Sequence, residues 1–132
     1  MVEEVFQVGV KALIRDGEGR FLIVKEKGAR YWDLPGGRIE RNESVIEAFS
    51  RELEEEIGIK EVGVLGLRDA VVSKIKIDVG KEKVGLFLIV YDCRLPKNQV
   101  LQGKGLEHQW ADRAELSKML GNKFPEEFLK NL

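Results

Sequence analysis

The segment from residue 44 to residue 58 restricts the fold more than any other part of the chain. Ser44 and Glu47 have the spacing of a capping box, which closes the first turn of a helix. Apolar residues then recur every three or four positions and predict one buried stripe, formed by Ile46, Phe49, Leu53 and Ile57. Gly58 follows where a helix commonly ends in left-handed backbone. The pattern predicts an amphipathic helix with one face in the core.

The chain before this helix has the patterns of β-strands. Residues 5–14 and 21–24 predict two strands, and the turn sequence at residues 16–19 predicts that they form a β-hairpin. Residues 31–34 predict a short extended piece. The Pro-Gly-Gly sequence at residues 35–37 disfavours any continuation of regular structure.

The chain after the helix predicts two longer strands around a Gly-Lys turn, then a loop and two short terminal helices. The predicted strands lie at residues 62–79 and 83–95, and the loop lies at residues 96–98. The predicted helices lie at residues 113–120 and 125–130. No internal repeat, low-complexity tract or linker interrupts the pattern. We therefore expect a single domain over residues 1–132, of the α/β (α+β) class, in which helices and strands form layers.

Composition and charge narrow the functional classes. The 132 residues are 43% apolar and 34% charged, as in soluble globular domains, and the net charge is −1. Such a chain does not attract polyanions by its overall field, so a bound polyphosphate needs a local arrangement. This balance favours a metal site and argues against long nucleic acid as a partner. No signal peptide or membrane-spanning run is visible, so we expect a cytoplasmic protein with no membrane partner. Cys93 is the only cysteine and predicts a buried, inert thiol.

Three glutamates lie on one side of the predicted helix. At about 100° per residue, Glu52, Glu55 and Glu56 project within about a 100° arc, beside the apolar stripe. Carboxylates crowded at the edge of a buried face repel one another and are costly to desolvate. A hard divalent cation offsets that cost, and Mg²⁺ and Mn²⁺ prefer carboxylate oxygens. An acidic helix is more often only a solvated face, so the spacing of the whole segment decides between the two interpretations.

The segment from Gly37 to Ile59 resembles the Nudix box of the MutT-like Nudix hydrolases. That signature is a glycine, five residues, a glutamate, seven residues, Arg-Glu, an aliphatic, any residue, Glu-Glu, any residue, a glycine and an aliphatic. Every specified position is filled, by Gly37, Glu43, Arg51, Glu52, Leu53, Glu55, Glu56, Gly58 and Ile59. A chance match at one starting point is on the order of 10⁻⁹ or less. The Leu-Pro-Gly-Gly sequence before the box, and Trp110 followed by Ala-Glu-Leu at residues 114–116, also resemble the family.

The resemblance implies a Nudix-type α/β/α sandwich with a central mixed sheet, in which the box forms a loop, a helix and a loop. It implies that Glu52, Glu55 and Glu56 bind the metal, Mg²⁺ with Mn²⁺ as the alternative, and that the backbone at Gly37 offers a carbonyl. Glu43 and Arg51 would brace the loop against the helix. The implied reaction is attack of water on a phosphorus of a nucleoside diphosphate linked to another group.

The sequence is less specific about which residue is the general base and which residues contact the substrate. The family places its base variably, so Glu52, Glu56 and Glu107 are all candidates, and an ordinary exposed glutamate is the alternative for Glu107. Lys25 and Arg38 are candidates for phosphate binding, although basic residues near a loop are common. Trp32 either stacks on a base or packs in the core. The only histidine, His108, is expected at the surface.

Three functions compete. The first is hydrolysis of a small nucleotide, namely a nucleoside triphosphate, an oxidised nucleotide or a nucleotide sugar. The second is a dinucleoside polyphosphate or RNA 5′-end pyrophosphohydrolase, which the lack of a basic stripe disfavours. The third is a non-catalytic nucleotide-sensing domain, which has no need of the full set of acidic residues. The strands also offer edges through which a homodimer could form.

Overall fold

The structure is a computed structural model that describes residues 3–96, 101–102 and 106–132. Its strands are β1 (Phe6–Ile14), β2 (Phe21–Glu26), β3 (Gly36–Arg38), β4 (Gly63–Val79), β5 (Glu82–Arg94) and β6 (Leu106–Ala111). Its helices are α1 (Val45–Ile57), α2 (Arg113–Leu120) and α3 (Glu126–Lys130). The predicted helices and the long β4–β5 pair are confirmed. Most of the predicted loop at residues 96–98 lies outside the described residues.

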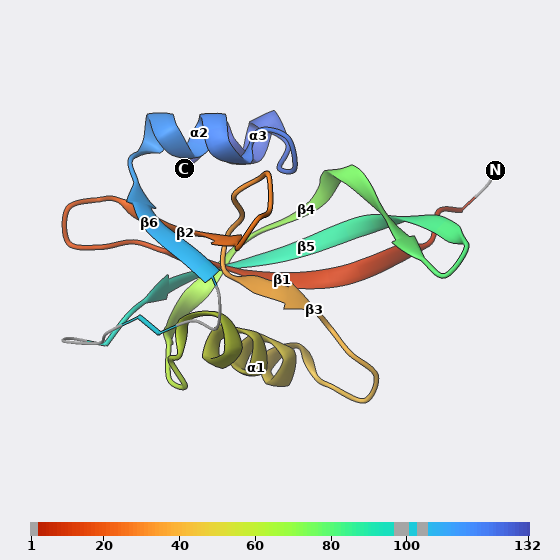
Figure 1. Cartoon of the computed structure of the whole chain (residues 1–132), viewed down its shortest axis with the longest axis horizontal. Coiled ribbons are helices and arrows are strands. Elements are labelled where there is room, and N and C mark those ends of the chain that lie inside the picture. Colours follow the sequence, from red (N-terminus) through yellow and green to blue (C-terminus); the bar gives the residue numbers. More distant parts are fainter. Residues whose placement is uncertain (1–2, 97–100, 103–105) are drawn as a thin grey trace.

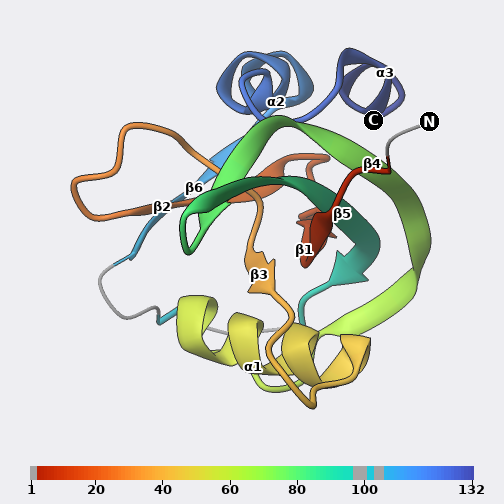
Figure 2. The same ribbon diagram turned by 90° about the vertical axis from the view of Figure 1, so that its right-hand side faces the viewer.

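The strands form a four-stranded mixed sheet and a smaller antiparallel pair. The order in the larger sheet is β3-β1-β5-β4, with β1 parallel to β5 and the other pairs antiparallel. Strands β2 and β6 pair with each other. Helix α1 lies on one side of the strands, and α2 and α3 lie on the other (Figures 1 and 2). The predicted α/β/α sandwich with a central mixed sheet is confirmed.

Two apolar clusters hold the layers together. Phe49, Leu53 and Ile57 of α1 pack against β1 and β2 in one cluster. The other cluster lies beneath α2 and α3 and includes Phe21 and Phe124, which are both fully buried. Burying a side chain of this size stabilises the fold by roughly 1.5–3 kcal/mol relative to exposure. Strands β1 and β2 contribute to both clusters and are therefore apolar on both faces.

Helix α1 begins and ends where the sequence predicts. The Ser44 hydroxyl accepts a hydrogen bond from the Glu47 amide, the Glu47 carboxylate accepts one from the Ser44 amide, and Gly58 ends the helix with φ 73°. The predicted burial of Ile46 is wrong, because its side chain is 55% exposed. Ile46 lies in the first turn and lines an open groove with Val62 and Val64, so the core does not close over it.

The predicted hairpin of the first two strands is wrong. A hydrogen bond from the Asp16 amide to the Arg20 carbonyl closes the turn, but the strands then separate into different sheets. β5 pairs along the whole of one edge of β1, and β3 pairs with the other edge at Gly9–Lys11. Among the residues that the structure describes, only an isolated antiparallel bridge between Arg15 and Phe21 remains of the predicted hairpin. β2 pairs instead with β6, a strand that the sequence did not predict.

The extended piece ends before Pro35, as predicted, but a new strand that the sequence did not predict begins at Gly36. Gly36 begins β3 and pairs with Lys11 of β1. Gly36 has φ 136°, and a Cβ atom built there would lie 2.0 Å from the Val10 carbonyl oxygen. Only glycine therefore allows this close approach of the two strands.

Two smaller expectations can be compared with the structure. Cys93 is buried, and burial together with the nearby Asp92 raises the pKa of its thiol to about 12, so it is inert as predicted. Within the described residues, no helix combines the length and the apolar content needed to cross a bilayer.

Candidate active site

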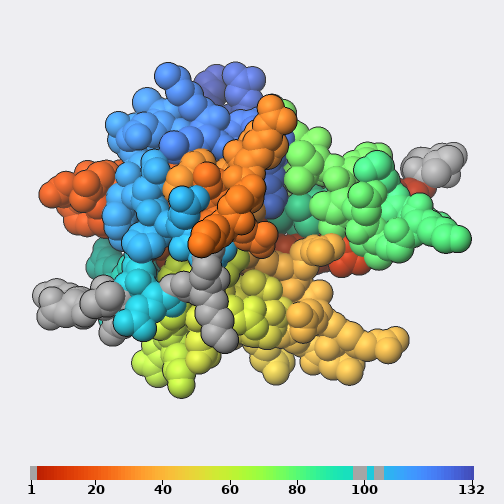
Figure 3. Space-filling model, in the orientation of Figure 1, coloured from red at the N-terminus to blue at the C-terminus, as the bar shows by residue number. Residues whose placement is uncertain are grey.

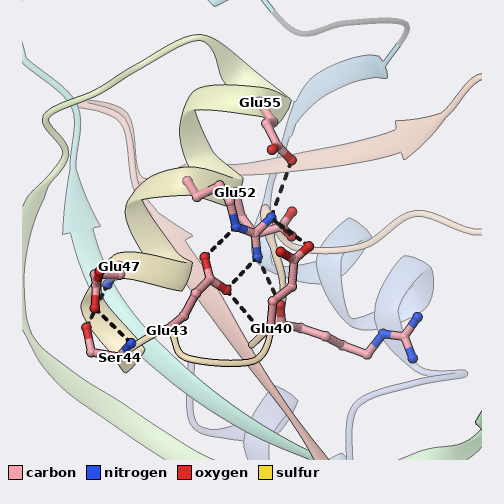
Figure 4. Close-up of polar contacts among 8 residues, drawn as sticks. Glu40, Glu43, Ser44, Glu47, Glu52 and Glu55 are labelled. Atoms are coloured by element: carbon pink, nitrogen blue, oxygen red, sulfur yellow. Dashed lines mark hydrogen bonds and ion pairs between the residues drawn. The ribbon is translucent and has the colours of Figure 1, made fainter.

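A network around Arg51 joins the loop after β3 to helix α1. The guanidinium donates to both carboxylate oxygens of Glu43, at 2.6 and 2.9 Å, and to the Arg38 carbonyl at 3.2 Å. It also donates to Glu52 at 2.8 Å and lies 3.5 Å from the carboxylate of Glu55. Figure 4 shows the carboxylates of the labelled glutamates 40, 43, 52 and 55 around this one group. The loop and the helix are thus held together by one side chain.

The charges in this network stabilise one another. The hydrogen bond from Arg51 lowers the pKa of Glu43, and the Glu40 amide adds to the effect. The same contact with Glu43, followed by Glu52, raises the pKa of Arg51 despite partial burial. A planar guanidinium that binds a carboxylate through two parallel hydrogen bonds is a geometrically specific pair. The loop therefore has a defined position relative to the helix before any ligand binds.

Gly37 allows the Glu52 carboxylate to lie directly against the backbone of β3. A Cβ atom at residue 37 would be 2.3 Å from the carboxyl carbon of Glu52, well inside contact distance. The Glu52 side chain is only 17% exposed. A carboxylate and a glycine backbone are thus in contact at the place where the sequence predicts a metal-binding carbonyl.

Glu56 is the acidic residue of α1 whose ionisation is most altered. Its Oε1 accepts a 2.6 Å hydrogen bond from the Gly36 amide. Burial raises the pKa of Glu56 to about 7, and the nearby Glu52 and Asp33 add to the rise, although Lys11 and the Gly36 amide oppose it. The positive groups near Glu56 therefore do not offset the cost of burying its ionised carboxylate.

The donors fit a hard divalent cation, although they do not form a closed cage. Across the described ranges, no three acidic, histidine or cysteine side chains lie close enough together to enclose a metal ion. Glu55 is 59% exposed and turns toward Arg51, whereas Glu52 and Glu56 lie at the buried edge. Oxygen donors from two half-buried carboxylates, with a glycine backbone in contact, are chemically suited to Mg²⁺ or Mn²⁺. A cation would also supply the positive charge that Glu56 lacks.

A buried cluster of charges that the sequence did not predict lies next to Glu56. Lys11 of β1 donates to Asp33 Oδ2 at 3.0 Å and to the carbonyls of Leu34 and Gly36 at 3.3 and 3.2 Å. Lys123, between α2 and α3, donates to the same Asp33 oxygen. The sequence held one signal, because a lysine between Val10 and Ala12 interrupts an apolar strand.

The electrostatics of the cluster follow from its burial. Burial tends to raise the pKa of Asp33, but Lys11 and Lys123 outweigh this effect and lower it. The pKa of Lys123 is lowered, first by burial and then by the charge of Lys11. We therefore treat Asp33 as ionised at neutral pH. The cluster holds two ammonium groups and one carboxylate beside the acidic helix.

A cavity of about 220 Å³ opens beside this cluster. Lys11, Asp33 and Glu56 contribute to its lining, together with Lys25 and Tyr31. Figure 3 shows the segment after β2 (orange) on this face of the molecule, between the C-terminal helices and α1. A larger cavity, of about 730 Å³, is lined by residues such as Arg68 and Asp92 and includes none of the acidic residues of α1. Of these two cavities, only the smaller is lined by Glu56 and by the Lys11–Asp33 pair.

Glu107, a candidate for the general base, forms an ion pair with a residue of β2. Glu107 is 56% exposed and lies 3.2 Å from Lys25, its partner across the β2–β6 pair. Alternate residues of a strand share a face, and Ile23 packs beneath α2. Lys25 shares the face of Ile23 and also lines the cavity that Glu56 lines, so the Lys25–Glu107 pair lies beside that cavity. The Lys25 ammonium also lies 5.3 Å from the centre of the Trp32 ring.

Arg38 and Trp32 are the other two residues that the sequence predicts to contact the substrate. The side chain of Arg38 is exposed, and the described contact of this residue with the network is made by its carbonyl. Trp32 is partly buried and packs against the cluster beneath α2. His108 is exposed, as expected.

The layers and the acidic loop-helix-loop at residues 36–58 define the class of protein as a Nudix-type α/β/α sandwich. The chain belongs to the NUDIX domain family, whose model matches residues 5–132.

Solved structures of the same fold cover nearly the whole chain. The MutT protein from Methanosarcina mazei Go1 has a TM-score of 0.66 and 26% identity, over 99% of this chain and 95% of that one. The E. coli dihydroneopterin triphosphate pyrophosphohydrolase has a TM-score of 0.72 over 98% of this chain and 97% of that one. At 15% identity, the second likeness shows the fold alone.

Curated relatives match over shorter stretches. The RNA pyrophosphohydrolase of Halorhodospira halophila is 38% identical over 63 residues, which are 46% of this chain and 35% of that protein. The phosphatase NudJ of Escherichia coli K12 is 44% identical over 50 residues, which are 36% of this chain and 33% of that protein. The matched segments thus span about a third of the length of these relatives.

Proposed function

We propose that the protein is a Mg²⁺- or Mn²⁺-dependent pyrophosphohydrolase that cleaves a diphosphate bond in a small nucleoside diphosphate-linked compound. The substrate class comprises nucleoside triphosphates, oxidised nucleotides and nucleotide sugars. The observation that carries the proposal is the half-buried Glu56 carboxylate, which is held by the Gly36 amide beside Glu52. The family membership supports it, since relatives are named pyrophosphohydrolase and phosphatase.

Each residue of the site has a proposed role. Glu52, Glu55, Glu56 and the Gly37 carbonyl would hold the cation, while Arg51 and Glu43 keep the loop on the helix. A bound divalent cation would neutralise charge on the diphosphate and acidify a water molecule. Glu52 and Glu56, whose carboxylates lie at the buried edge of α1, are the candidates in this helix to accept a proton from that water molecule.

Glu107 is a weaker candidate for the base, because it is exposed and paired with Lys25. Lys25, Arg38 and Trp32 remain proposed substrate contacts. Lys25 lines the 220 Å³ cavity that adjoins Glu56, so it is the first of these to test. A homodimer and a cytoplasmic location remain predictions; light scattering in solution tests the first.

A nucleotide panel tests the proposal. GTP, 8-oxo-dGTP, UDP-glucose, diadenosine tetraphosphate and a 5′-triphosphorylated RNA are incubated with the protein and either Mg²⁺ or Mn²⁺, and the products are separated by chromatography. We expect turnover of a small nucleotide, and a fall of about 10²-fold or more in E56Q. E54Q is the matched control, because Glu54 is an exposed glutamate of the same helix.

Each other outcome has a defined meaning. Hydrolysis of only the dinucleotide or the RNA would support the second candidate function, a dinucleoside polyphosphate or RNA 5′-end pyrophosphohydrolase. The name of one curated relative agrees with that function. Binding without turnover, under either cation, would support the nucleotide-sensing alternative. Equal activity of E56Q and E54Q would contradict the proposed role of Glu56.

A further inference from the structure

Two lysines from distant parts of the chain share one carboxylate oxygen. Lys11 Nζ and Lys123 Nζ both donate to Asp33 Oδ2, although Lys123 is 90 positions from Asp33 in the sequence. The side chains of Lys11, Lys123 and Asp33 are 7%, 16% and 25% exposed. Burying two ammonium groups for one carboxylate is unfavourable unless each proton has an acceptor. The three charged groups are therefore expected to depend on one another for their positions.

The ion pair is not what holds the loop that carries Lys123. The Lys123 carbonyl accepts from the Ser73 hydroxyl at 2.7 Å and from the Lys74 amide at 2.8 Å. A β-bulge in β4, between Val72 and Lys76, accompanies this contact. The neighbouring Phe124 is fully buried. The backbone at Lys123 is thus held independently of its side chain, which is aimed at Asp33.

The other end of the cluster leads to the acidic helix. The Lys11 ammonium has three protons and three acceptors, which are Asp33 Oδ2 and the carbonyls of Leu34 and Gly36. The Gly36 amide then donates to Glu56 Oε1 at 2.6 Å. A continuous series of polar contacts therefore runs from Lys123 through Asp33, Lys11 and Gly36 to Glu56.

We propose that Lys123 is a positioning residue: by sharing Asp33 it keeps Lys11 on the Gly36 carbonyl and thereby keeps the Gly36 amide on Glu56. The inference rests on the proposed function, because it assigns a purpose to the placement of Glu56. In this proposal the segment between α2 and α3 helps to position the residues of the site. The described residues show no hydrogen bond or ion pair between Lys123 and Glu56.

The physical reason is the balance of charge on Asp33. With both lysines present, the carboxylate is shared, and Lys11 retains its two bonds to backbone carbonyls. Without Lys123, Lys11 becomes the only counter-ion that the described contacts give Asp33, and it is drawn toward the carboxylate. The Gly36 carbonyl then loses its Lys11 donor, so the backbone of this residue is less restrained and the hydrogen bond from its amide to Glu56 weakens. The preceding Pro35 carbonyl keeps its hydrogen bond from the Ala12 amide, so the strand itself stays in place.

Nuclear magnetic resonance of the metal-free protein tests this directly. In K123M we expect the Gly36 amide proton to move upfield and to exchange with solvent about 10-fold faster than in the wild type, as for loss of one hydrogen bond. K74M is the matched control, because Lys74 Nζ donates to the Gly121 carbonyl and anchors the same loop without contacting Asp33. K74M should leave the Gly36 resonance unchanged.

Manganese binding and kinetics provide two further readouts. We expect Mn²⁺ affinity, measured by electron paramagnetic resonance, to fall about 10-fold in K123M. On the best substrate of the panel, kcat should fall about 10-fold while KM changes less than about twofold. K123R keeps the charge and should restore most of kcat. In a D33N background, K123M should have little further effect, because Lys123 acts through Asp33.

The outcomes separate the two proposals. If the wild type hydrolyses no nucleotide, the Gly36 resonance and Mn²⁺ binding still decide the role of Lys123. An unchanged Gly36 amide and unchanged Mn²⁺ affinity in K123M would overturn it, as would additive effects of K123M and D33N. If K123M does not fold, K123Q carries the same comparison with K123R, since glutamine removes the charge and keeps a polar side chain.

Discussion

The backbone amide of Gly36 donates a 2.6 Å hydrogen bond to Oε1 of Glu56, twenty positions further along the chain. This contact links the first residue of β3 to the last turn of α1. It also places a carboxylate with a raised pKa beside a backbone whose carbonyl is held by Lys11.

Glu56 should make the stability of the metal-free protein depend on pH. Its pKa is about 7 in the folded chain, against an ordinary value of 4.5. Between these values the folded state retains a proton that the unfolded chain has released. The free energy of unfolding should therefore fall as pH rises through this window. Denaturation in EDTA at several pH values measures the slope, which E56Q should reduce and E54Q should retain. Equal slopes in all three proteins would contradict the assignment.

Cation binding should be linked to the same proton. Because a carboxylate must be ionised to bind a metal, Mg²⁺ or Mn²⁺ affinity should rise with pH, by up to about tenfold per unit below pH 7. Calorimetry in buffers of different ionisation enthalpy counts the protons released. E56Q should bind more weakly and release fewer protons. Affinity that does not change with pH would mean that Glu56 is not a ligand.

The two glycines of β3 should respond differently to alanine. G36A places Cβ 2.0 Å from a backbone oxygen and forces an L-residue to φ 136°, so it should destabilise the fold by about 2–4 kcal/mol. G37A meets only the end of the flexible Glu52 side chain, which can move away. We expect G37A to change stability by less than about 1 kcal/mol but to weaken Mn²⁺ binding.

Thermal denaturation together with Mn²⁺ titration distinguishes these two effects. G17A is a suitable control, since a Cβ at Gly17 meets nothing within 4 Å. Similar losses of stability in G36A and G37A would show that Glu52 cannot move as supposed.

Arg51 should not be replaceable by lysine. R51K keeps the charge but cannot bind both oxygens of Glu43 while also reaching the Arg38 carbonyl. We expect kcat to fall about 10-fold or more because the loop is no longer held on the helix. R41K, which changes an exposed arginine of the same loop, is the control. If R51K and R41K have the same steady-state kinetics, the proposed role of Arg51 in holding the loop is wrong.

Local patterns predicted the features that depend on neighbouring residues. The boundaries of α1 follow from Ser44, Glu47 and Gly58, whose contacts lie within one or two helical turns. The strands β4 and β5 were predicted because a short turn at Gly80 brings them together. The acidic face of α1 follows from helical periodicity alone. The family could be predicted because the box residues lie within one continuous segment.

Strand pairing and the buried charges were decided by the tertiary structure. Whether β1 pairs with β2 or with β5 depends on which edges the other strands occupy, and this is not encoded in the residues of β1 themselves. Lys11 and Asp33 are 22 positions apart, and Lys123 is 90 positions from Asp33. By itself, then, the sequence determined the helix, its carboxylates and the family. Only the folded chain decided which of those carboxylates is buried and which lysines surround it, because desolvation and Coulomb forces depend on distance in space.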